Sequence, residues 1–227
     1  GPLTEAPASP IITVPALVTA MTNPLDLLAQ VRLGLRVTAA RDRSVDDLIP
    51  VDLTGLYSWA VAQQLLDADA FGHRRDEVLS WLRRSGDIPV VDPAGQIDEA
   101  VDRVDALLEA VADHIGVPLA DAERLVVDTP TDDGRHIQGS IPMVLGDTVA
   151  LVTPSFSKTS RILETWTHLA LALGATGGRI HRAVVIQRAA KQGVEVTEIG
   201  IGADRGAEAL DLLISTHESN THLMKGI

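Results

Sequence analysis

Residues 136–153 read HIQGSIPMVL, GD, TVALVT, which are two segments of strand composition separated by a Gly-Asp pair. Both segments are rich in apolar and β-branched residues, and Gly146-Asp147 is typical of a tight hairpin turn. The sequence therefore predicts two neighbouring antiparallel strands, at His136–Leu145 and Thr148–Thr153.

Further strands and helices are predicted on both sides of this hairpin. A strand at Arg124–Asp128 leads into it through a turn at Pro130–Gly134. The segments predicted after it are a helix at Thr159–Leu173, strands at His181–Gln187 and Val194–Ile199, and a last helix from Asp204 to about Glu218. This order predicts the α/β class, with a mixed sheet and helices on its faces.

The helix at Thr159–Leu173 carries the large apolar residues of this half. Its spacing places Ile162, Trp166, Leu169 and Leu173 on one side. If Trp166 is a core residue, the substitution Trp166→Ala is expected to lower the free energy of unfolding by roughly 3–5 kcal/mol.

The first half of the chain is predicted to be helical. Thr13 is a helix cap with Pro15 in the first turn, and the clearest amphipathic stripe runs from Ile97 to Ile115. The other segments are helices at Leu25–Leu35, Leu53–Leu66 and Asp76–Arg84, and a surface loop at 38–50. The domain organisation expected is a cleavage scar and disordered lead at 1–10, a helical half at 11–118 and an α/β core at 119–227, which together form one domain.

Composition narrows the classes of function. The 227 residues carry a net charge of −12, which argues against an autonomous nucleic-acid binder, because such a protein needs a cationic surface. No cysteine is present and no apolar run reaches the roughly 18 residues of a membrane span, so a cytoplasmic protein is expected. Only three of the 19 basic residues are lysine, which indicates a GC-rich coding sequence such as those of actinobacteria.

The predicted hairpin, strand, helix and strand resemble the core of restriction-endonuclease-like nucleases, whose motif is PD-(D/E)XK. In those enzymes carboxylates on two neighbouring strands hold Mg²⁺. In this chain Pro142 stands where the metal-binding Asp is expected, and Pro154 follows the second strand. Neither 135–146 nor 148–159 contains Asp or Glu, so we expect no catalytic residue, no metal site and no cofactor.

The chain resembles the C-terminal domain of RecC, the exodeoxyribonuclease V gamma subunit. That family has a nuclease-like fold with prolines in place of the acids. The order and spacing of short motifs carry this resemblance over roughly 200 residues. The motifs are Ile12–Leu35 (ITVPALVTAMTNPLDLLAQVRLGL), Asp52–Leu66 (DLTGLYSWAVAQQLL), Ser85–Pro89 (SGDIP), Gly139–Pro142 (GSIP), Pro154-Ser155 and the helix segment Trp166–Ala170.

The resemblance implies a non-catalytic domain that gives structural support and guides DNA in the RecBCD (exonuclease V) helicase–nuclease. That complex processes double-strand breaks for homologous recombination. The partners implied are RecB-like (beta) and RecD-like (alpha) subunits, and through the complex double-stranded DNA ends and single strands, with no membrane. Two alternatives stay open. One is a Mg²⁺-dependent nuclease with migrated acids, such as Glu123 or Asp128 with Glu164, and the other is a stand-alone protein-binding module.

One basic segment is a candidate for contact with DNA phosphates or with an acidic subunit surface. It contains Arg179, Arg182, Arg188 and Lys191. The other interpretation is four ordinary solvated charges, which the acidic composition favours.

Overall fold

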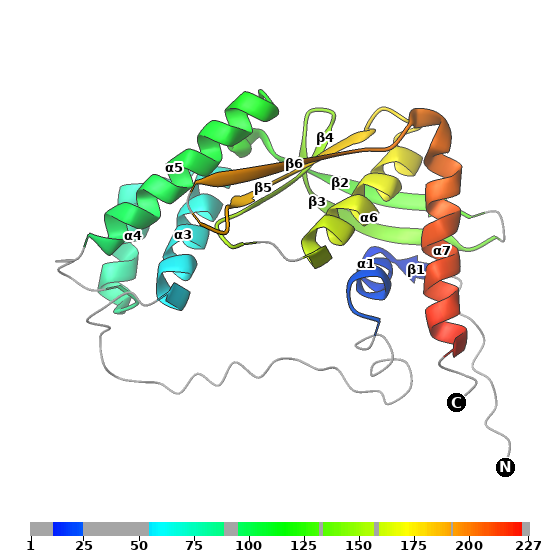
Figure 1. Ribbon diagram of the computed structural model, residues 1–227, viewed down its shortest axis with the longest axis horizontal. Coiled ribbons are helices and arrows are strands. Elements are labelled where there is room, and N and C mark those ends of the chain that lie inside the picture. The colour runs from blue at the N-terminus through cyan, green and yellow to red at the C-terminus, as the bar shows by residue number, and fades with distance from the viewer. Residues whose placement is uncertain are drawn as a thin grey trace, which may run out of the picture.

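The computed structural model describes residues 11–24, 55–88, 95–131, 134–156, 159–191 and 193–223. Figure 1 shows one sheet with helices packed on both of its sides. The elements are β1 (Ile11–Thr13), α1 (Val14–Thr22), α3 (Gly55–Ala70), α4 (Arg75–Ser85), α5 (Gln96–His114), η1 (Leu119–Asp121), β2 (Glu123–Pro130), β3 (His136–Leu145), β4 (Thr148–Thr153), α6 (Thr159–Ala175), β5 (Arg182–Arg188), β6 (Val194–Gly200), η2 (Ala203–Arg205) and α7 (Gly206–Leu223). The predicted helix at Leu25–Leu35, the loop at 38–50 and the lead at 1–10 lie outside the described residues.

The six strands form one mixed sheet in the order β1-β3-β4-β5-β6, and β2 pairs with β3. The β2–β3, β3–β4 and β5–β6 pairs are antiparallel, whereas β4–β5 and β1–β3 are parallel. The helix α6 makes the crossover between the parallel strands β4 and β5, as such a connection requires. The α/β class and the mixed sheet predicted from the sequence are confirmed.

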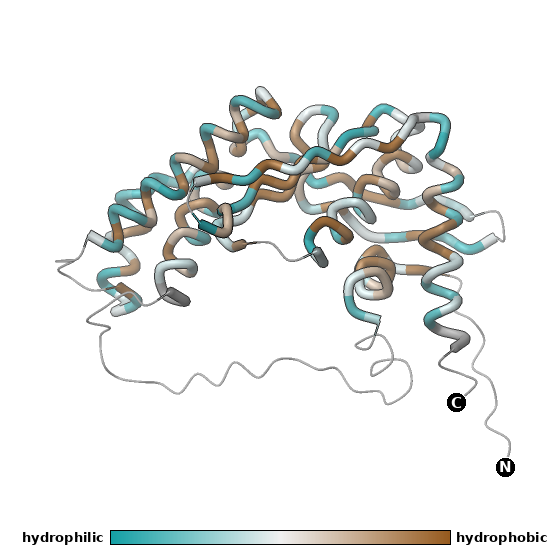
Figure 2. The backbone as a smooth tube through the Cα atoms, viewed as in Figure 1, coloured by the Kyte–Doolittle hydropathy of each residue, from teal (hydrophilic) through white to brown (hydrophobic). Residues whose placement is uncertain are grey.

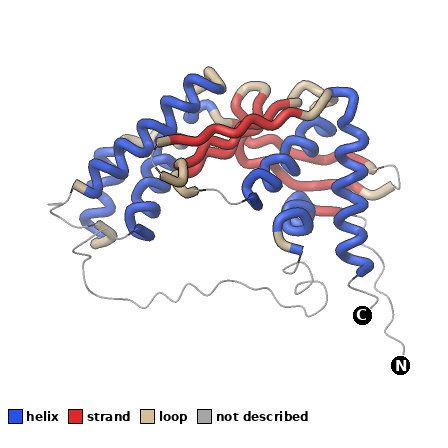
Figure 3. Tube along the Cα trace, viewed as in Figure 1, coloured by secondary structure: helices blue, strands red, loops and turns tan. Residues whose placement is uncertain are grey.

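Two hydrophobic cores lie against the sheet, one on each face. One joins α3, α4 and α5 to alternate residues of the central strands, such as Val152 and Ile186. The other joins α1, α6 and α7 to their neighbours, such as Val149 and Ala183. Figure 2 shows the hydrophobic character of the central strands, and Figure 3 shows the strands between two groups of helices. Because both faces are covered, β5 is a continuous buried run rather than an alternating one.

Local signals in the sequence fix the ends of several helices. Thr13 caps α1, since its side chain accepts a hydrogen bond from the Ala16 amide at 3.3 Å. Gly86 ends α4 in the left-handed conformation, with φ 78°. Gly116, with φ 75°, follows the end of α5. These boundaries agree with the predicted ones.

The strand β1 was not predicted. Its three residues pair in parallel with β3, from Ile11 opposite His136 to Thr13 opposite Gln138. Helix α1 follows directly and packs against α6 and α7 in the second core. A hydrogen bond links α7 to α1, because Asn220 Nδ2 donates to the Ala20 carbonyl at 3.1 Å. The first residues of the predicted helical half therefore form a strand of the sheet, β1, and a helix that packs on the sheet, α1.

Two details of the predicted helices differ from the structure. Trp166 is half-buried at the margin of the second core. The loss of free energy of unfolding expected for Trp166→Ala depended on a buried core position, and Trp166 does not occupy one. Asp204, expected to begin the last helix, lies in the 3₁₀ turn η2, and α7 begins at Gly206.

Candidate functional site

The strands β3 and β4 form a fork. Next to the hairpin turn they pair through Val144 with Val149 and Leu145 with Thr148. Beyond that point β4 runs beside β5, and β3 pairs instead with β1 at residues 136–138. In the nuclease resemblance, this opening between two strands is where carboxylates hold the metal.

Neutral side chains stand at the fork. Pro142 is exposed on β3, and Pro154 is buried directly after β4. At the end of β4, Thr153 and Ser155 hydrogen bond to each other. The Ser155 amide donates to the Thr153 hydroxyl at 3.3 Å, and the two hydroxyl oxygens lie 2.8 Å apart. Proline, threonine and serine supply no negative charge to bind Mg²⁺.

A pocket of about 530 Å³ opens beside the end of β4. It is lined by Thr22 and Asn23 at the end of α1, Ser155 and Phe156 after β4, and Ser160, Arg161 and Glu164 of α6. Arg161 Nη1 lies 2.9 Å from Glu164 Oε2, so Glu164, the one carboxylate among the described lining residues, forms an ion pair on its own helix. The Phe156 side chain is 56% exposed. The pocket therefore combines an aromatic surface, hydroxyl groups and a neutralised acid.

The other acids considered as migrated ligands have different surroundings. Asp128 of β2 is 3.1 Å from His136 Nδ1 and accepts a hydrogen bond from Gln138 Nε2 at 3.4 Å, and these contacts hold the pKa of its carboxyl below the usual value. Glu123 is exposed at the start of β2. In the part of the chain that the structure describes, no three or more His, Asp or Glu side chains are grouped so as to hold a metal ion.

The basic segment is divided between the two ends of β5. Arg182 begins the strand, and Arg188 ends it. Six residues of extended chain separate them, about 20 Å. Arg179 is exposed before β5, and Lys191 is exposed in the turn after it. The structure therefore does not bring the four cations together.

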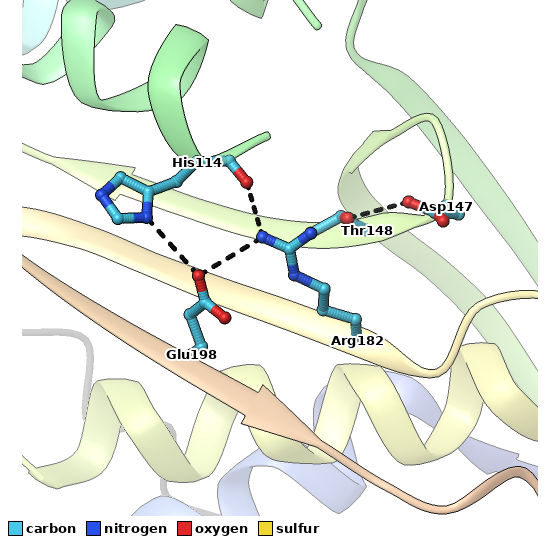
Figure 4. Close-up of polar contacts among 5 residues, drawn as sticks. All are labelled: His114, Asp147, Thr148, Arg182 and Glu198. Atoms are coloured by element: carbon cyan, nitrogen blue, oxygen red, sulfur yellow. Dashed lines mark hydrogen bonds and ion pairs between the residues drawn. The ribbon is translucent and has the colours of Figure 1, made fainter. Parts of the chain in front are cut away.

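Arg182 has structural contacts within the chain (Figure 4). Its Nη2 donates to the His114 carbonyl oxygen at 2.5 Å and lies 3.4 Å from Glu198 Oε1, which is also 3.4 Å from His114 Nδ1. Because these residues belong to β5, to the end of α5 and to β6, Arg182 joins three elements. Its Nε is buried without a hydrogen-bond partner among the described residues.

We expect Arg182→Met to lower the free energy of unfolding by about 1–2 kcal/mol, because the hydrogen bonds of a charged donor to the end of α5 and to β6 are lost. Arg179→Met is the matched control, since Arg179 is exposed and its replacement should change the free energy by less than about 0.5 kcal/mol. Urea unfolding of both variants measures the difference. Equal midpoints would contradict this role of Arg182.

One cation of this region was not singled out from the sequence. Arg103 of α5 lines a second pocket together with Arg188 and Lys191. No local motif marks it, because the contact joins residues that are 85 positions apart in the chain.

Comparison with known proteins identifies the family. The RecC C-terminal domain family matches residues 10–223. The RecBCD enzyme subunit RecC of Mycolicibacterium smegmatis (strain ATCC 700084 / mc(2)155) is 25% identical over 177 residues, which are 77% of this chain and 16% of that protein. This organism fits the expected actinobacterial source. The chain thus spans about a sixth of the length of this curated relative.

Among solved structures, that of LHK-Exo in complex with dAMP is similar at 13% identity and a TM-score of 0.32, over 74% of this chain and 93% of that one. The family match covers almost the whole sequence, from before β1 into α7. The chain belongs to the RecC C-terminal domain family.

Proposed function

We propose that this chain is a non-catalytic domain that supports and guides DNA in a RecBCD-type helicase–nuclease. In this proposal it acts in the cytoplasm, in double-strand-break repair and homologous recombination. Its partners are RecB-like and RecD-like subunits and, through the complex, double-stranded DNA ends and single strands. Membership of the RecC C-terminal domain family supports this role. No described helix is long and apolar enough to cross a membrane.

The observation that carries the non-catalytic role is the chemistry of the β3–β4 fork. A metal-dependent nuclease needs carboxylates there to bind Mg²⁺, to activate water and to neutralise the developing phosphoryl charge. In this chain Pro142, Thr153 and Ser155 occupy the region. The two hydrophobic cores pack on both faces of the sheet and stabilise the strands without carboxylates at these positions.

One observation favours the rival function, a Mg²⁺-dependent nuclease. Glu164 lines the pocket beside the fork, and an acid from a helix can replace an acid from a strand. Its ion pair with Arg161 weakens this alternative, because a cation at 2.9 Å competes with a divalent metal for the same oxygens.

Incubation of the purified chain with linear DNA and Mg²⁺ or Mn²⁺ tests the two functions. We expect no degradation above the level without metal. Glu164→Gln and Glu208→Gln form a matched pair. Each removes the acid of an ion pair with an arginine three residues earlier in the chain. Degradation that Glu164→Gln abolishes and Glu208→Gln leaves intact would establish the nuclease instead.

The scaffold role has a separate test in a pull-down. The immobilised chain is expected to retain the RecB-like and RecD-like subunits of its own complex. Retention of neither subunit would count against the structural role, whatever the outcome of the nuclease assay.

A further inference from the structure

A cationic pocket lies at the carboxyl end of β5, on the face of the sheet that α5 covers. Its volume is about 420 Å³. The charged residues of its lining are Glu99, Asp102 and Arg103 of α5, Arg188 at the end of β5, and Lys191 in the following turn. Ala106, Leu107, Gly193 and Val194 complete the wall.

Arg103 is one of the three cations that line this pocket. It is half-buried, and its Nη1 donates to the Ser58 hydroxyl at 3.2 Å. Burial lowers the pKa of its guanidinium, and the nearby positive charge of Arg188 lowers it further, while Glu99 acts in the opposite direction. Among the described residues, no carboxylate lies within ion-pairing distance of Arg103, Arg188 or Lys191.

This arrangement suits an oxyanion. Arg103 and Arg188 line the same pocket and their like charges repel, so an anion bound there would lower the free energy of the folded chain. A guanidinium presents its donors in a planar fork, which matches the oxygens of a phosphate and allows two parallel hydrogen bonds. The lysine adds a third cation on a flexible stem.

The position of the pocket favours the phosphate of a nucleic-acid strand. In the register of the parallel strands, Thr153 of β4 lies beside Gln187 of β5. Phe156, whose side chain is exposed, follows the carboxyl end of β4, and Arg188 ends the adjacent strand β5. An exposed aromatic side chain and cations therefore lie at the same end of two adjacent strands. Such groups bind single strands through base stacking and phosphate contacts.

We propose that Arg103, Arg188 and Lys191 form a binding site for the phosphate backbone of single-stranded DNA. The proposal rests on the DNA-guiding part of the proposed function and specifies its surface. It also explains how a chain with a net charge of −12 contacts DNA, because the contact uses a local group of cations and not the overall charge.

The test is a binding titration of the whole chain with a fluorescein-labelled oligo-dT single strand, followed by fluorescence anisotropy. The titration is repeated at several salt concentrations between about 50 and 200 mM. The variant Arg103→Gln/Arg188→Gln removes two cations of the pocket. Its matched control is Arg83→Gln/Arg84→Gln, which removes two exposed arginines at the end of α4 and gives the same net charge.

We expect the pocket variant to bind at least tenfold more weakly than the wild type. Its plot of log affinity against log salt should lose about 0.7 of slope for each phosphate contact removed. The control variant should stay within about twofold of the wild type. Unfolding by urea checks the fold, and Arg188→Gln alone should not destabilise the chain, because it removes a repulsive neighbour of Arg103.

Three outcomes would overturn the proposal. They are an unchanged affinity and salt slope in the pocket variant, an equal loss in both double variants, and no measurable binding by the wild type at the lowest salt. The pull-down with the partner subunits separates this failure from that of the proposed function. If the pocket variant still retains those subunits while DNA binding is unaltered, the scaffold role stands and the phosphate site does not.

Discussion

Gly139→Ala is expected to lower the free energy of unfolding by about 3 kcal/mol or more, since it combines backbone strain with a steric clash. Gly139 lies in β3 with φ 152°, a conformation that side chains rarely adopt. A Cβ built there lies 2.9 Å from both Cβ and Cγ2 of Val14, the first residue of α1. Helix α1 must therefore move away from the sheet, and its packing on α6 and α7 is weakened. Urea unfolding measures the loss.

Gly177→Ala is the control for the backbone contribution. Gly177 also has a positive φ, 61°, but a Cβ there meets no atom within 4 Å. We expect it to cost about 1 kcal/mol, the strain alone. If the two substitutions cost the same, the close approach of α1 to β3 contributes nothing to stability, and the glycine of the G-x-x-P segment has another purpose.

The β3–β4 hairpin shows how far the sequence alone predicts this fold. The predicted bounds of both strands agree with the observed ones, because the turn residues and the β-branched composition are local signals. The three residues of β1 carry no such signal. Their strand conformation depends on hydrogen bonds to β3, about 125 positions away, and short apolar segments do not reveal their partners.

The candidate sites also differ in how far the sequence alone predicts them. The lack of acids at Pro142 and Pro154 could be found from the sequence, because two strands without Asp or Glu supply no carboxylate to a metal ion wherever they lie in the fold. The basic segment could not be interpreted in that way. Arg182 and Arg188 are close in sequence but stand at opposite ends of β5, and Arg188 instead lines a pocket with Arg103 of a distant helix. Charge proximity is set here by tertiary structure and not by spacing.

The side of α6 that faces the core was predicted correctly in part. Leu169 and Leu173 are buried, whereas Trp166 lies at the margin and Ile162 is half-buried near the start of the helix. Helical spacing gives a direction but not a depth, because depth depends on how closely α1 and α7 approach α6. Trp166 lines a pocket together with residues of η2 and α7, such as Arg205 and Leu212. The stability of this layer is therefore better tested at a leucine than at the tryptophan.

Leu169→Ala is expected to lower the free energy of unfolding by about 2–5 kcal/mol. The Leu169 side chain is 0% exposed and belongs to the second core, with α1, α7 and the sheet around it. Three lost carbon atoms leave a cavity that packed neighbours on several elements cannot fill together.

The matched control is Leu163→Ala on the same helix, since Leu163 is half-buried and lies outside both cores. That change should cost about 1 kcal/mol or less, the transfer of partly exposed methyl groups. A Leu169 variant as stable as the Leu163 variant would mean that α6 is not packed into a continuous core, against its place in the second core.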